Sequence, residues 1–295
     1  MKRLRIAFCT ITIIVVFSFF YYNNQYYARR LIAAIDAKDI NQVEQLLMSP
    51  TGNVNSPPAL CPLFWSLLTE LYVYTPLQEA CRKGDYEIIK LLVEHGATPN
   101  RVGTYPYSPL MIVVEKMDVD RFKAVELLVE NGANLNYITR GQCAISLAAE
   151  TNCLESVVLI EYFESKGQDV YGQYPFGSLL HYACRGGNSE AICYLVTIRR
   201  MDVNAINEDG ETPLVSLMHP LAEKRIEDVY FLLDNGANVS VANASGRNVF
   251  YYSATSGNAD IASFFKNIAY GKRQSYFTDR EQILQSSSVR KPMSL

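Results

Sequence analysis

The stretch from Thr75 to Asn100, TPLQEACRKGDYEIIKLLVEHGATPN, predicts two short helices and the turn between them. Thr75 is a suitable N-cap, and Pro76 suits the first helical position because its missing N–H would have no intrahelical partner there. Gly84 ends this helix, and Gly96 closes the next one. The second helix has an apolar stripe at helical spacing, formed by Ile88, Ile89, Leu91, Leu92 and Val93. One such pair cannot bury its apolar faces alone, so the stretch predicts further copies of itself.

Copies of this stretch recur along the chain. Aligned on the opening triplet, they start at Ser108-Pro109-Leu110, Cys143-Ala144-Ile145, Ser178-Leu179-Leu180, Thr212-Pro213-Leu214 and Asn248-Val249-Phe250. The positions equivalent to Pro76 are separated by 33, 35, 35, 34 and 36 residues. Through TPLQEA, SLLHYACRGGN, GETPL and NGANLN, which occur in register, the sequence resembles the ankyrin-repeat family over about 240 residues.

The resemblance implies an all-α fold, an ankyrin-repeat solenoid in which helix–turn–helix repeats are joined by β-hairpin loops. About seven repeats are expected over residues 29–270, beginning with a degenerate terminal repeat at Arg29–Ser56. Residues 57–74, PPALCPLFWSLLTELYVY, interrupt the pattern as an insertion. Residues 271–295 are polar and have no apolar stripe, so we expect a disordered tail there.

The first 28 residues predict a cytoplasmic stub and a single-pass transmembrane anchor. Lys2, Arg3 and Arg5 precede an uncharged run. Residues 6–22 would form about 25 Å of helix, just long enough for a bilayer core. Tyrosines at positions 21, 22, 26 and 27 fit an aromatic belt at the far interface. A cleavable signal peptide and a buried soluble helix are the alternatives, although no small-x-small cleavage site follows the run.

The basic residues around this run also predict its orientation. Their small excess before the span favours an N-terminus on the cytoplasmic side. The repeats would then be extracytoplasmic, and periplasmic if the source is bacterial.

The sequence contains no constellation of residues that predicts catalysis, a cofactor or a metal site. His181 matches the position at which the family has a structural histidine between neighbouring hairpins. His95 ends a helix and His219 lies in a loop, and neither has a second ligand at metal spacing. Phosphate-binding, dinucleotide-binding and hydrolase motifs are absent from the sequence. We therefore expect a protein that is not an enzyme and has no small-molecule substrate.

The charge of the chain is uneven. Residues 31–270 contain 17 basic and 28 acidic residues, a net charge of −11, whereas both ends are basic. An acidic body argues against nucleic-acid binding, which depends on cationic contacts to phosphates. It would suit a basic protein partner, although acidic surfaces also serve solubility.

Two surfaces are candidates for contact with a protein partner, since the resemblance implies binding through the hairpin tips and the concave face of the first helices. Three consecutive tips, at 101–105, 137–140 and 171–176, carry aromatic residues. The helix row Glu79, Ile112, Leu147, Tyr182, Ser216 and Tyr252 is apolar or aromatic in its centre, where a solvated row would be polar. Alternatively, these rings pack on their own repeat or on the next one. The candidate partner-binding residues are Tyr105, Tyr137, Arg140, Tyr171, Tyr174, Phe176, Tyr182 and Arg185.

Together these features favour a membrane-anchored ankyrin-repeat module that binds a protein partner without catalysis. The alternative is a bacterial envelope inhibitor or immunity-type protein that neutralises an exported toxin or enzyme. Both would use the same surfaces.

Overall fold

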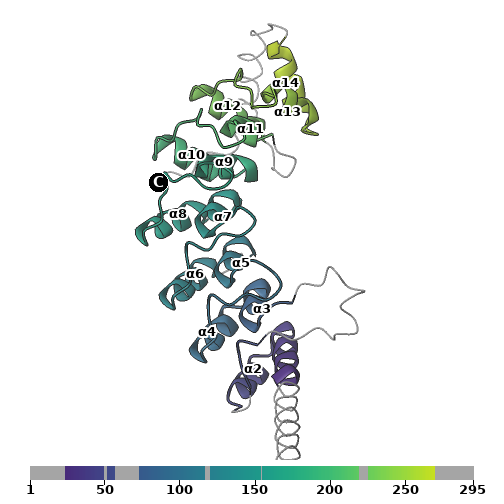
Figure 1. Ribbon diagram of the computed structural model, residues 1–295, viewed down its shortest axis with the longest axis vertical. Helices are drawn as coiled ribbons and strands as arrows, with labels where there is room; N and C mark the ends of the chain where they lie inside the picture. Colours follow the sequence, from purple (N-terminus) through teal and green to yellow (C-terminus); the bar gives the residue numbers. More distant parts are fainter. Residues whose placement is uncertain are drawn as a thin grey trace, which may run out of the picture. The chain divides into compact units, whose positions relative to one another are not determined.

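The chain is built from pairs of short helices joined by loops (Figure 1). The computed structural model describes residues 24–49, 52–56, 73–116, 120–153, 155–218 and 225–269. Within these residues the β-structure consists of isolated bridges at loops, such as Thr139 with Gln142 and Tyr174 with Gly177. The fold is therefore the predicted all-α solenoid. It divides into two compact units between Ala148 and Ala149, and each is described separately.

In the first unit the helices form two rows. A helix over residues 24–36 precedes α2 (Ile40–Leu47), α3 (Pro76–Lys83), α4 (Tyr86–Glu94), α5 (Pro109–Lys116), α6 (Arg121–Glu130) and α7 (Ala144–Glu150), whose end crosses into the second unit. The first helices of consecutive repeats pack together, as α3 does on α5. The second helices do the same, because α4 packs on both α2 and α6. Each repeat thus buries the apolar faces of its neighbours.

The second unit repeats this arrangement. Its helices are α8 (Ser156–Ser165), α9 (Leu179–Gly186), α10 (Ser189–Thr197), α11 (Pro213–Ser216), α12 (Ile226–Asp234), α13 (Val249–Thr255) and α14 (Ala259–Ala269). The row of first helices runs from α9 through α11 to α13, and the row of second helices from α8 through α10 to α12. The last pair, α13 and α14, pack on each other.

The start and end of each first helix follow from local sequence. As predicted, Thr75 caps α3 and Pro76 is its first residue. The Thr75 hydroxyl accepts from the Gln78 backbone N–H, and the Gln78 side chain accepts from the Thr75 N–H, which completes a capping box. Gly84 ends the helix in the left-handed conformation, with φ of 68°. In α9, Ser178 and His181 form the corresponding box.

Asparagine side chains connect the loop of one repeat to the next. The Asn100 amide donates to the Gly132 carbonyl oxygen (2.8 Å) and accepts from the Asn134 N–H (2.7 Å). In the second unit, Asn204 makes the same two bonds to Gly236 and Asn238, at 2.9 and 2.7 Å. We call this pair of bonds an asparagine clamp. The clamp provides hydrogen-bond partners for one backbone carbonyl and one backbone N–H of the next loop, which are not paired in a β-sheet.

The buried cysteines are part of the packing. Cys81 and Cys184 occupy matching places in α3 and α9 and are fully buried, as expected for small core residues. All five cysteines in the described part of the chain are free thiols.

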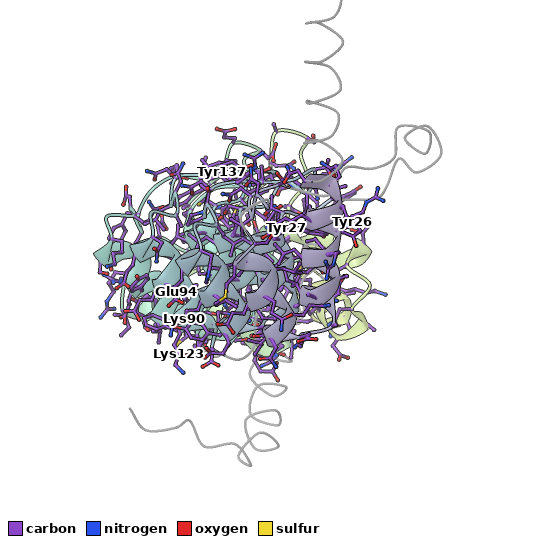
Figure 2. The ribbon with its side chains drawn as sticks, turned by 90° about the horizontal axis from the view of Figure 1, so that it is seen from below. Tyr26, Tyr27, Lys90, Glu94, Lys123 and Tyr137 are labelled. Atoms are coloured by element: carbon purple, nitrogen blue, oxygen red, sulfur yellow. The ribbon has the colours of Figure 1, made fainter. Side chains whose placement is uncertain are left out.

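The first described helix includes residues 24–28, which were predicted to lie before the repeats, and it continues to residue 36. Tyr27 is 7% exposed, and its ring lies against Gly52, where an added Cβ would clash with it. Tyr27 is therefore a core residue of the repeat, and its assignment to an aromatic belt was wrong. The preceding residue, Tyr26, is exposed to solvent (Figure 2).

Several predicted segments lie outside the described residues. These are the transmembrane segment at residues 6–22, most of the insertion at 57–74 and the tail at 271–295. None of the helices in the described part of the chain has the length and apolarity that a membrane crossing needs.

Candidate functional site

The hairpin tips of the first unit carry a cluster of tyrosines. The Tyr105 ring lies between those of Tyr74 and Tyr107, with ring centroids 4.9 and 5.3 Å away. The ring is half-buried, and burial is the main cause that raises the pKa of the Tyr105 hydroxyl to about 12. Gln78 holds the backbone of this cluster, because its side-chain amide donates to the carbonyl oxygens of Tyr105 and Tyr107.

Tyr137 and Arg140 lie on the following tip. The Tyr137 hydroxyl donates to the Pro106 carbonyl oxygen at 2.8 Å, which joins two consecutive tips. Arg140 and Gly141 both have positive φ, 51° and 76°, as a two-residue type I′ turn requires. Arg140 is exposed at the end of this turn. Figure 2 shows Tyr137 on the side of the unit opposite to Lys90, Glu94 and Lys123, the polar outer face of α4 and α6.

In the second unit, Tyr171 and Tyr174 fold onto nearby backbone. The Tyr171 hydroxyl donates to the Arg199 carbonyl oxygen (3.2 Å), yet the side chain remains 58% exposed. The Tyr174 hydroxyl donates to the carbonyl oxygen of Asp169 in its own loop, at 2.6 Å. Both rings are therefore held in place at the surface.

Tyr182 is not at the surface, which corrects one predicted contact residue. It is 0% exposed, and its hydroxyl accepts from the Phe176 N–H at 3.1 Å. Its ring contacts Tyr174 edge-on, with centroids 6.3 Å apart. The predicted contact row of first helices is largely closed to a partner, because α9 packs on α11 and α3 on α5. The row is buried at Glu79, Ile112, Leu147, Tyr182 and Ser216, and half-buried at Tyr252.

Arg185 lies on the last turn of α9, between an acid and a ring. Its Nε donates to Glu150 Oε1 at 3.0 Å, and its guanidinium lies 4.2 Å from the centre of the Phe176 ring. A cation over a ring face is stabilised by the ring quadrupole. Phe176 and Arg185, both predicted from sequence, therefore meet.

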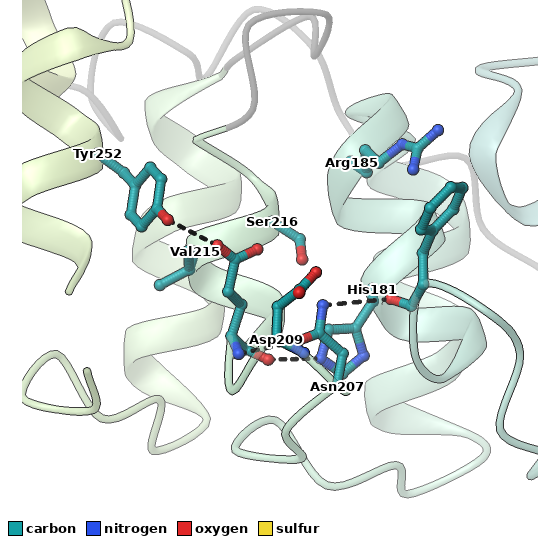
Figure 3. Close-up of a pocket in the computed structure, with 9 residues that line it drawn as sticks. His181, Arg185, Asn207, Asp209, Val215, Ser216 and Tyr252 are labelled. Carbon is teal, nitrogen blue, oxygen red and sulfur yellow. Dashed lines mark hydrogen bonds between the residues drawn. The ribbon is translucent and has the colours of Figure 1, made fainter. Parts of the chain in front are cut away.

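Phe176 and Arg185 line one side of a cavity of about 300 Å³ in the second unit (Figure 3). Its walls come from α9, the loop at 207–211, α11 and α13. The other residues that line it are His181, Asn207, Asp209, Glu211, Val215, Ser216 and Tyr252. Sequence reasoning missed this cavity, because its lining residues lie in three different repeats and the sequence does not show that they meet. The one available signal was the pair of acids that frames Gly210 immediately before the TPL triplet.

The imidazole of His181 joins the cavity floor to the next loop. Its Nδ1 accepts from the Ser178 N–H at 3.1 Å, so the proton is on Nε2, which donates to the Glu211 carbonyl oxygen at 3.0 Å. Burial lowers the pKa of this ring, which favours the neutral form. The predicted structural role of His181 is confirmed.

The Glu211 carboxylate is oriented by two residues of the following repeat. Its Oε1 accepts from the Tyr252 hydroxyl at 2.7 Å and from the Asn243 amide at 3.4 Å. Burial is the main cause that raises the pKa of the Tyr252 hydroxyl, and its hydrogen bond to the Glu211 carboxylate is the second cause. The hydroxyl therefore stays a donor at neutral pH. The cavity thus has a fixed carboxylate on one wall and a paired arginine on the other. In the described part of the chain, no three His, Cys, Asp or Glu side chains gather closely enough to hold a metal ion.

These repeats, capping boxes and clamps agree with a known family. A model of ankyrin repeats, three copies long, matches residues 31–139, 77–171 and 145–243. The chain belongs to the ankyrin-repeat family. Ankyrin-repeat domains are typical protein-interaction scaffolds, and nothing in the fold or the comparisons indicates enzymatic activity.

Other ankyrin-repeat proteins match parts of the chain. The putative ankyrin repeat protein R96 of Acanthamoeba polyphaga mimivirus is 24% identical over 208 residues, which cover 68% of this chain and 16% of that protein. The human transient receptor potential cation channel subfamily A member 1 is 27% identical over 179 residues, 57% of this chain and 15% of the channel. The chain thus matches less than a fifth of the length of either relative.

A solved structure supports the fold. The crystal structure of the human ASB11 ankyrin repeat domain superposes with a TM-score of 0.59 at 20% identity, over 79% of this chain and 94% of that one. At this identity the likeness concerns the fold alone.

Proposed function

We propose that the ankyrin repeats bind a protein partner through aromatic and arginine side chains at their hairpin tips, without catalysis. The observation that carries this proposal is Tyr171, a large ring that is 58% exposed on a loop while its hydroxyl is held by the Arg199 carbonyl oxygen. Aromatic residues and arginine contribute most of the binding energy at many interfaces. A ring already held in place loses little conformational entropy when a partner covers it.

In the first unit, the proposed contact residues are Tyr105, Tyr137 and Arg140. Tyr105 is restrained by its stacked neighbours and Tyr137 by the Pro106 carbonyl oxygen. Arg140 is exposed at the end of a tight turn. These groups combine two rigid rings with a cation, which suits a partner with both apolar and acidic groups at its surface.

In the second unit, the proposed contact residues are Tyr171, Tyr174, Phe176 and Arg185. Tyr182 is assigned a supporting role instead, since it is buried and its hydroxyl holds the Phe176 N–H. A partner would contact the edge of Phe176, whose face is covered by Arg185.

The proposal is tested by affinity capture with the 295-residue chain as bait, from the cells that make it. The Y137A/R140A/Y171A variant should lose the captured partner. The control is K90A/E94A/K123A, which truncates three exposed side chains on the opposite side of the first unit (Figure 2). Equal recovery by the tip variant and the wild type would contradict the proposed surface.

We further propose that residues 6–22 anchor the chain in a membrane, with the repeats on the extracytoplasmic side. The support is the uncharged run itself and the basic residues before it. Protease added to intact cells should then degrade the repeats and leave the N-terminus protected. Repeats that are released by washing with alkaline carbonate would argue against an anchor.

A second candidate function is that of an envelope inhibitor or immunity-type protein. The net charge of −11 over residues 31–270 favours it, because an acidic body attracts a basic exported toxin or enzyme. Captured partners should in this case be basic and lose activity when the chain is added. A partner that stays fully active in the complex would favour a scaffold instead.

A further inference from the structure

The cavity in the second unit has a composition that suits one long side chain. Val215 and Phe176 give it apolar wall area, and the Tyr252 ring closes one end (Figure 3). Asp209 and Glu211 contribute two carboxylates from the same loop. At about 300 Å³ it lies at the lower limit of ligand pockets. That volume fits one extended side chain better than a folded segment.

The charges that face the cavity are not balanced. Arg185, the cation in its wall, is already paired with Glu150 and covers the Phe176 ring. Among the described residues, no ion pair involves Asp209 or Glu211. His181 is neutral, as its hydrogen bonds require. Arg247 of the next hairpin lies over the Tyr251 ring at 4.9 Å and also hydrogen-bonds the Tyr252 hydroxyl, but in the described part of the chain it forms no ion pair with either carboxylate. The lining therefore carries unpaired negative charge.

The Glu211 carboxylate is also held in position before any ligand arrives. Both of its hydrogen bonds, from Tyr252 and Asn243, reach Oε1. A carboxylate that is fixed through one oxygen can present the other to a donor with little loss of entropy.

We propose that this cavity accepts a basic side chain, arginine or lysine, from the protein partner. The cationic head would bind the carboxylates of Asp209 and Glu211, and the aliphatic stem would lie along Val215 and the Tyr252 ring. The net charge of −11 in the repeats would attract such a segment from a distance. This inference rests on the proposed function and gives the partner a specific chemistry: a basic residue on an extended or loop segment.

The test uses a phage-displayed library of random nonapeptides, selected on the 295-residue chain. Selected peptides should share a basic residue, and its replacement by citrulline should lower their affinity at least about tenfold, because citrulline keeps the shape of arginine and loses the charge. The D209N/E211Q variant should bind the unmodified selected peptides with an affinity that is lower by the same factor. The control variant E126Q/E130Q, which removes two exposed carboxylates from α6, should bind as the wild type does. Circular dichroism and thermal melting verify that all three proteins are folded.

Three results would overturn the inference. The first is equal binding of the selected peptides to the wild type and D209N/E211Q, or a selection that yields no peptide dependent on these acids. The second is binding that appears only after residues 270–295 are removed, which would assign the cavity to the basic C-terminal segment of the chain itself. The third is a captured partner that needs Tyr137, Arg140 and Tyr171 but binds D209N/E211Q normally, which would leave the proposed function intact.

Discussion

The Nε2 of His181 donates to the carbonyl oxygen of Glu211 at 3.0 Å and so joins α9 to the loop of the next repeat. The same ring accepts from the Ser178 N–H through Nδ1. Gln78 does both tasks at the matching position of α3, where its Oε1 accepts from the Thr75 N–H and its Nε2 donates to Tyr107. Two different side chains thus provide the same acceptor and donor.

This equivalence predicts a large loss of stability for one substitution at His181 and a small loss for another. His181→Ala should lower the free energy of unfolding by about 2–4 kcal/mol, because it leaves one N–H and one carbonyl oxygen buried without partners. His181→Gln should lower it by less than about 1 kcal/mol, since glutamine can restore both bonds. Chemical denaturation of the 295-residue chain measures both values. A glutamine variant as unstable as the alanine variant would show that packing of the ring, rather than its hydrogen bonds, matters.

Asp228 predicts how stability depends on pH. It is buried on α12, where burial raises the pKa of its carboxyl to about 6, opposed by a hydrogen bond from the Ser189 hydroxyl (2.9 Å) and the charge of Arg225. Since the native state holds this proton more tightly than the unfolded state, its contribution to stability falls as pH rises from about 4 to about 6 and stays low above that.

Asp228→Asn should therefore stabilise the protein at pH 7, by about 2–3 kcal/mol at most. The effect should become small near pH 4, where the native carboxyl is protonated and the unfolded one is about half protonated. Denaturation at pH 4, 5, 6 and 7 measures it. Glu126→Gln, at an exposed carboxylate on α6, serves as the control. A gain that is the same at all four pH values would refute titration of Asp228 as its cause.

The asparagine clamp gives a third prediction. Asn204→Ala removes the bonds to Gly236 and Asn238 and should cost about 1–2 kcal/mol. The Asn238 amide should also exchange its hydrogen faster, since its acceptor is lost. Asn41→Ala, at an exposed position of α2, should change neither quantity. Equal stability of Asn204→Ala and Asn41→Ala would mean that solvent replaces the clamp without loss.

Substitution of Tyr182 should affect mainly stability, and substitution of Tyr171 should affect mainly partner binding. Tyr182→Ala removes a fully buried ring and should cost about 3–5 kcal/mol. Tyr171→Ala truncates an exposed ring and should cost less than about 1 kcal/mol. In capture assays with folded protein, Tyr171→Ala should reduce recovery of the partner more than Tyr182→Ala does. Partner binding that is unaffected by Tyr171→Ala would remove this residue from the proposed surface.

The repeats could be predicted from sequence because their signals are local. Thr75, Pro76 and Gly84 act within one or two turns of the helix that they start or end, so three residues suffice to place it. The burial of Tyr182 could not be predicted in this way, because it depends on how α9 packs on α11. Tyr27 was misjudged for a similar reason, since its contact is Gly52 in the following loop.

The acidic cavity was beyond sequence reasoning for the same physical cause. Glu211 acquires its role from Asn243 and Tyr252, which follow it by 32 and 41 residues. By contrast, Phe176 and Arg185 were identified by residue type alone. They are only nine residues apart, in a loop and at the end of the helix that follows it, so their contact is local in sequence.

The asparagine clamp also gives each unit a direction. Asn204 holds a loop that lies 32 to 34 residues towards the C-terminus, and Asn100 does the same in the first unit. Because each clamp joins only neighbouring repeats, a unit under load should yield one repeat at a time, and a force–extension trace should show a staircase of small rips.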